Sequence, residues 1–150
     1  MAVTNYDITS AAYHPEGAHD YELSILTGMD SFVYIIRDRT RNQLLAYQSQ
    51  TIPAADQKDW PATINKMIQA DDKLRSITYG NCILGWESER LTLVPQPLYD
   101  ASNPRAYLEQ LTLIGLEDTV RAERYQELGG ELLFAAPTIR LDAAERRLRP

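Results

Sequence analysis

Residues 21–50 contain three consecutive segments with β-strand patterns, and the connections between them are very short. Tyr21, Leu23 and Ile25 alternate with polar residues, which is the period of a half-buried strand. Residues 32–36 form a continuous β-branched and aromatic run, typical of a central strand buried on both faces. Residues 43–50 form a third segment. Connections this short exclude crossovers, so the sequence predicts an antiparallel meander of three strands.

The rest of the chain alternates between helical and strand patterns. Apolar residues recur at helical spacing after Asp56, which is a plausible helix N-cap. Residues 76–84 and 91–94 read as strands, and Asn103 and Pro104 begin a second helix. Further predicted elements are a hairpin of 119–125 with 131–135 around Gly129 and Gly130, and a helix over 137–150 with Ile139, Leu141, Ala144 and Leu148 inward. The order βββαββαββα predicts an α/β fold with a mixed sheet.

Composition narrows the functional classes. The 150 residues suffice for one domain with a proper core. The net charge of −6 disfavours nucleic-acid binding, because an acidic surface repels phosphates. No apolar stretch approaches the length of a membrane span, and residues 1–20 read as a polar, partly ordered leader rather than a signal peptide. A single cysteine, Cys82, cannot form an internal disulfide, so we expect a cytoplasmic protein.

Several segments resemble a known family. They are Tyr21-Glu22-Leu23-Ser24-Ile25, the strand over 32–36, and Leu91-Thr92-Leu93-Val94-Pro95 with the aromatic residues that follow it. Together they are similar to an uncharacterised Bacteroidota family labelled domain of unknown function 3822, from about residue 21 to residue 137. The family resembles the actin, Hsp70 and sugar-kinase superfamily, whose fold has two ribonuclease-H-like halves around a nucleotide cleft.

The resemblance implies a domain division and a candidate site. Residues 21–118 would form one ribonuclease-H-like subdomain, and residues 119–150 would be a hairpin and helix that start a second lobe. The chain would then correspond to the N-terminal half of longer family members. The phosphate-binding turn of the superfamily lies between the first two strands, which here places it at Thr27, Gly28, Asp30 and Ser31.

The chemistry at this turn is incomplete. A phosphate hairpin needs glycine N–H groups and a carboxylate that orients a metal-bound water. The superfamily places an aspartate two residues before the glycine, where this chain has Leu26. An ordinary hairpin, in which Gly28 supplies a positive φ, is therefore favoured over ATP and magnesium binding. No cofactor is expected otherwise.

No other residue group forms a complete catalytic or metal-binding motif. His14 and His19 lie in a flexible-looking segment and do not supply a tetrahedral zinc site. Cys82 reads as a buried, inert thiol, and the paired carboxylates fall at turns and helix ends. Tyr99 and Tyr107 flank a proline-containing loop, and they are candidates for an interaction surface because tyrosine is enriched at interfaces.

The leading hypothesis is a non-catalytic interaction or scaffold domain with a degenerate actin-like fold. The alternative is a nucleotide-binding protein that uses Thr27–Ser31, and a third class is a hydrolase with an unrecognised site. Half of a two-lobed fold should expose an apolar face, which favours a protein partner or self-association. The hairpin over 119–135 and the helix from Thr138 are the elements expected to lack support.

Overall fold

The computed structural model describes residues 2–148, which form two compact units. The first unit comprises the chain up to Glu87 together with residues from Asp142 onward, and the second comprises Ser88–Leu141. The elements of the first unit are β1 (Val3–Thr9), η1 (Pro15–Asp20), β2 (Tyr21–Thr27), β3 (Ser31–Asp38), β4 (Gln43–Thr51), α1 (Ala54–Gln57), α2 (Trp60–Ala70), α3 (Asp72–Arg75) and β5 (Asn81–Trp86). Those that follow are β6 (Leu91–Pro95), η2 (Gln96–Leu98), α4 (Pro104–Glu109), β7 (Asp118–Tyr125), η3 (Gln126–Leu128), β8 (Gly130–Pro137) and α5 (Thr138–Leu148).

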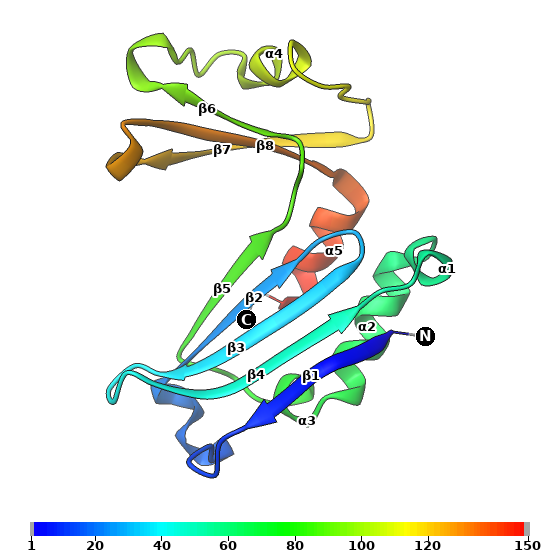
Figure 1. Ribbon diagram of the computed structural model, residues 1–150, viewed down its shortest axis with the longest axis vertical. Coiled ribbons are helices and arrows are strands. Elements are labelled where there is room, and N and C mark those ends of the chain that lie inside the picture. Colours follow the sequence, from blue (N-terminus) through cyan, green and yellow to red (C-terminus); the bar gives the residue numbers. More distant parts are fainter. Residues whose placement is uncertain (1, 149–150) are drawn as a thin grey trace. The chain divides into compact units, whose positions relative to one another are not determined.

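The first unit is built on a five-stranded mixed sheet with the order β1-β4-β3-β2-β5 (Figure 1). The predicted meander is confirmed, because β2, β3 and β4 pair antiparallel in sequence order. After the helical segment the chain returns as β5, which pairs parallel with β2. The mixed α/β fold predicted from the order of patterns is therefore present.

The first twenty residues are not a leader without regular structure. Residues Val3–Thr9 form β1, which pairs antiparallel with β4 at the edge of the sheet, and Pro15–Asp20 form a 3-10 helix. Ala18 of that helix is buried in the core. The strand escaped prediction because all seven of its residues are exposed, so it lacks the alternation that a half-buried strand imposes on a sequence.

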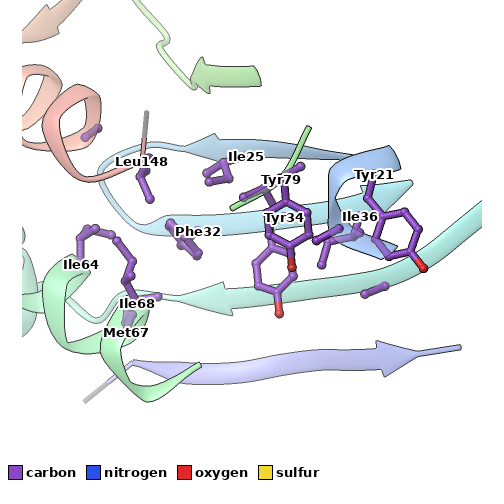
Figure 2. Close-up of a cluster of buried hydrophobic side chains, with 14 of the residues drawn as sticks. Tyr21, Ile25, Phe32, Tyr34, Ile36, Ile64, Met67, Ile68, Tyr79 and Leu148 are labelled. Carbon is purple, nitrogen blue, oxygen red and sulfur yellow. The ribbon is translucent and has the colours of Figure 1, made fainter. Parts of the chain in front are cut away.

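One face of the sheet carries the main core. Trp60, Ile64, Met67 and Ile68 recur along one side of α2 and are all buried. Figure 2 shows three of them, Ile64, Met67 and Ile68, beside Phe32 of β3 and Leu148 of α5. The strand β3 contributes alternate residues to this core, so the prediction that it is buried on both faces is wrong.

The second unit has a three-stranded antiparallel sheet with the order β6-β8-β7. Its core consists of Val94, Leu108, Leu133 and Ala135. The predicted hairpin is confirmed, and Gly129 ends η3 with a φ of +63°. The hairpin and α5 do not lack support, since Leu133 and Ala144 are fully buried, although Ile139 is 73% exposed rather than inward.

The units divide the chain at a different place from the predicted boundary at residue 118. Strand β6 pairs with β8, so the segment from Ser88 belongs with the β7–β8 hairpin. Residues 142–148 rejoin the first unit, where Leu148 packs in the main core. Among residues 2–148, no helix combines the length and the apolar character that crossing a membrane requires.

Candidate functional site

The turn between β2 and β3 is closed by its own hydrogen bonds. The N–H of Gly28 donates to the carbonyl oxygen of Ser31 over 3.1 Å, and the Thr27 hydroxyl donates to the same oxygen over 3.0 Å. Thr27 is fully buried. Two groups that a phosphate hairpin would present to a ligand are therefore already used within the turn.

Gly28 does not adopt a positive φ. Among the described residues, Gly129 is the glycine with a left-handed backbone, so that part of the hairpin prediction is wrong. A Cβ atom at Gly28 would instead lie 3.1 Å from the Cβ of Glu87 and 3.2 Å from its carbonyl oxygen. The position favours glycine, because the chain leaving β5 would have to shift by a few tenths of an ångström to admit a Cβ atom.

The helix α2 and the end of β5 hold the turn from two sides. The indole N–H of Trp60 donates to the Gly28 carbonyl oxygen over 2.9 Å. The Glu87 N–H donates to the carbonyl of Thr27 over 2.8 Å, and the Ser31 hydroxyl donates to the Glu87 carboxylate over 2.7 Å. Because Glu87 brings a carboxylate to the turn, and none of these hydrogen bonds comes from a lysine or arginine, the electrostatics oppose a phosphate.

The third predicted residue of the turn, Asp30, is exposed. Its carbonyl oxygen accepts from the N–H of Ile52 over 2.7 Å. The structure thus brings Thr27, Gly28 and Ser31 together with Trp60 and Glu87, two residues that sequence reasoning did not connect with the turn. Across residues 2–148 no three His, Cys, Asp or Glu side chains gather as a metal site.

Tyr99 and Tyr107 stack on each other in the second unit, with ring centroids 6.0 Å apart. Both are partly buried against its core. The Tyr107 hydroxyl donates to the carbonyl of Leu98 and accepts from the N–H of Asp100, each over 2.7 Å. Packing and turn formation account for this arrangement, and a role of the pair in partner binding stays a prediction.

The sheet face opposite the core of the first unit exposes several apolar residues. Register places Ile83, Ser24, Ile35, Tyr47 and Ile8 side by side in one row across all five strands. A second row contains Gly85, Leu26, Val33, Ser49 and Tyr6 in the same order of strands. We refer to these two rows as the open face.

Apolar side chains on the open face are accessible. Ile8 and Tyr6 are each 61% exposed, Ile83 is 50% and Leu26 is 46% exposed. A half-buried sheet normally presents polar residues on its outer face. The sequence signal was present in the apolar residues at both parities of β3, but the pattern was interpreted as burial on both faces.

A polar row borders the open face. The Arg37 guanidinium donates to Glu22 over 3.1 Å, and the other oxygen of Glu22 accepts from Asn81 over 2.8 Å. These charges are paired with each other, so the open face itself carries no unpaired charge from this row.

The arrangement of the first unit defines a class of fold. Three antiparallel strands, a helical connection and a strand parallel to the first are similar to one ribonuclease-H-like half of an actin-like protein. The structure is similar to that of a protein from Bacteroides thetaiotaomicron with an actin-like ATPase fold and unknown function, with a TM-score of 0.80 and 13% sequence identity. The match covers 91% of this chain and 52% of that one, so the chain spans about half the length of the protein it matches.

The chain belongs to the family described as "Protein of unknown function (DUF3822)", whose sequence model it matches over residues 10–146. No curated protein shows significant sequence similarity to it. The resemblance inferred from the sequence is therefore confirmed for both the family and the fold.

Proposed function

We propose that the chain is a non-catalytic interaction domain that associates with a second copy of itself through the open face. The observation that carries this proposal is the open face, to which each of the five strands contributes at least one apolar side chain. Exposed apolar patches of this kind on a protein surface mark association sites. The interaction would take place in the cytoplasm, which the presence of a single cysteine, Cys82, in the sequence supports.

A second copy is the occupant that the chemistry of the open face favours. An apolar row can pack against the same row of another copy around a two-fold axis, which makes the surface self-complementary. The charges at its border already pair with each other, so no oppositely charged partner is needed. The whole outer face of five strands spaced ~4.8 Å apart and about six residues long spans about 500 Å² per copy, or roughly 1,000 Å² in total, which is near the lower limit of specific interfaces. The two rows of the open face make up about two thirds of this area.

The non-catalytic part of the proposal rests on the turn at Thr27–Ser31. The Gly28 N–H and the Thr27 hydroxyl donate to the Ser31 carbonyl oxygen within the turn, and Glu87 places a negative charge beside the turn. Titration of ATP with magnesium into the protein should therefore produce no binding heat. Saturable binding that is lost in Gly28→Val would contradict this part of the proposal and would favour nucleotide binding.

Self-association is tested by measuring the molar mass in solution as a function of concentration. We expect a dimer whose fraction rises with protein concentration, and a monomer for Ile35→Lys, which places a charge at the centre of the first row. Ile139→Lys is the matched control, because Ile139 is exposed and lies outside the open face. A wild-type protein that remains monomeric at about 100 µM, where even a weak specific dimer forms, or equal effects of the two substitutions, would overturn the proposal.

A further inference from the structure

A groove of about 700 Å³ lies on the opposite side of the first unit from the open face. Its floor comes from β1 and β4, and its wall comes from α2 and the start of α3. This volume falls within the range of small-molecule sites. The groove belongs entirely to the first unit and has no residue in common with the turn at Thr27–Ser31.

The floor of the groove is a row of polar side chains on adjacent strands. Asp7 and Gln48 line the groove and are direct neighbours across β1 and β4. Tyr34 of β3 lies next to Gln48 in the same row but does not line the groove. Gln48 is only 6% exposed, and its Oε1 accepts a hydrogen bond from Gln50. Its Nε2 donates to no residue among those the structure describes. The Nε2 atom is not fully buried, so it can donate to a ligand oxygen in the groove that Gln48 lines.

Asp71 connects the helical wall of the groove to strand β3 of the sheet. One oxygen of its carboxylate accepts from the Tyr34 hydroxyl over 2.6 Å, and the other accepts from the N–H of Lys73 over 2.8 Å. Burial, together with this hydrogen bond, raises the pKa of Tyr34, so the phenol remains a neutral donor. Both oxygens of Asp71 are engaged, and its role is to hold the groove in shape.

The remaining charges of the groove are incompletely paired. The Lys73 Nζ atom lies 3.9 Å from the Asp7 carboxylate, which is too far for a hydrogen bond. Lys66 lines the groove and forms no ion pair within residues 2–148. Asp72 also lines the groove, but it pairs with Arg75 over 2.6 Å, and Asp56 lies on α1. A loosely paired cation and anion thus line the same groove as the Gln48 amide.

Beside Asp7 and Lys73, a ligand with a single charge is disfavoured. An anion near Lys73 would also lie near Asp7, and a cation near Asp7 would lie near Lys73, so each meets a like charge. A molecule that carries both charges a few ångströms apart can place each one beside its opposite. The apolar side chains of Met67 and Ala70 provide a surface for a nonpolar substituent.

We propose that this groove binds a free amino acid, with its ammonium group at Asp7 and its carboxylate at Lys73 and the Nε2 of Gln48. Met67 and Ala70 would contact the ligand side chain. The proposal does not depend on self-association, because the groove and the open face lie on opposite sides of the sheet.

The first experiment screens the proteinogenic L-amino acids for a rise in melting temperature of the intact protein, followed by titration calorimetry of the amino acid with the largest effect. We expect saturable binding with a dissociation constant of about 1 mM or tighter. The methyl ester of that amino acid, which keeps only the ammonium, and its N-acetyl form, which keeps only the carboxylate, should each bind at least ~10-fold more weakly. No saturable binding by any amino acid, or equal binding of the blocked forms, would overturn the proposal.

Substitutions locate the site. Asp7→Asn and Lys73→Met should each weaken binding by roughly 10-fold, the effect of one lost charge-assisted contact. Lys58→Met is the matched control, because Lys58 is exposed and does not line the groove. Folding of each variant is checked by its melting temperature without ligand. If Lys58→Met weakens binding as much as Lys73→Met, or if both groove variants bind normally, the assignment is wrong.

Discussion

Individual residues at the β2–β3 turn have structural roles that a sequence motif search assigns differently. Thr27, Gly28 and Ser31 stand where a phosphate hairpin would place its donors, yet each one bonds to or packs against another part of the first unit. Their position could be predicted from the sequence. Their structural roles could not be predicted, because these roles depend on Trp60 and Glu87. Both residues are distant in the sequence, and no motif links them to the turn.

The indole of Trp60 provides a test at this scale. Trp60→Phe keeps an aromatic ring in the core but removes the N–H that donates to Gly28. Loss of a buried hydrogen bond should lower the free energy of unfolding by about 1–3 kcal/mol, measured by urea denaturation. Trp86→Phe is the control, because Trp86 contacts Trp60 at 5.5 Å between ring centroids and is less buried. Equal losses for the two variants would show that the hydrogen bond adds nothing.

The ion pair between Arg90 and Asp118 predicts a pH dependence in the second unit. Two hydrogen bonds, of 2.6 and 2.8 Å, join the groups, and they hold the pKa of Asp118 below its usual range. The folded carboxylate therefore has a lower pKa than the unfolded one. The stability that it contributes is present above about pH 4, the ordinary aspartate pKa, and is lost as the pH falls through the folded pKa.

Asp118→Asn should be less stable than the wild type at pH 7 and should approach it in stability near pH 3. The measurement is urea denaturation followed by circular dichroism at both pH values. Asp100→Asn is a useful comparison, because the Asp100 carboxylate accepts from Ser102 and has no cation as a partner within residues 2–148. A stability difference for Asp118→Asn that does not change with pH would contradict the role of the ion pair.

At the scale of elements, a strand could be predicted where its buried and exposed residues alternate. A strand without this alternation could not be predicted. The meander of β2, β3 and β4 could be predicted because one face of each strand is buried. Strand β1 is exposed along its whole length, so nothing in its sequence distinguishes it from a loop. The open face could not be recognised either, because apolar residues that await a partner look the same in a sequence as apolar residues that are already buried.

The junction before β5 tests how tightly the elements pack. A Cβ atom at Gly80 would lie within 3 Å of the carbonyl group of His19 in η1, where the backbone cannot yield easily. Gly80→Ala should therefore lower the free energy of unfolding by about 2 kcal/mol or more. Gly85→Ala should change it by less than about 0.5 kcal/mol, because the nearest atom belongs to the flexible, exposed side chain of Leu26. The order of the two effects, measured by urea denaturation, checks the packing.

At the scale of the whole molecule, the chain divides by strand pairing rather than by position. The resemblance to the family implies a boundary at residue 118. The structure places the boundary between Glu87 and Ser88, because β6 pairs with β8. Long-range pairing of this kind has no local signal, so a sequence analysed segment by segment does not reveal it.

Separate cores predict separate responses to mutation. Leu133 lies in the core of the second unit and Ile64 in that of the first, and both are at most 1% exposed. Leu133→Ala should speed hydrogen exchange in residues 88–141 and leave the first unit protected, while Ile64→Ala should do the reverse. Each should cost about 2–5 kcal/mol in its own unit. Uniformly faster exchange along the chain in either variant would show that the units unfold together.

The return of the chain to the first unit also has a consequence for biosynthesis. Residues 88–141 are contiguous, so the second unit can fold as soon as they leave the ribosome. The core of the first unit needs Ala144 and Leu148, which are synthesised afterwards. The nascent first unit therefore keeps part of its apolar core uncovered while the second unit is translated, and exposed apolar surface of this kind is prone to aggregation.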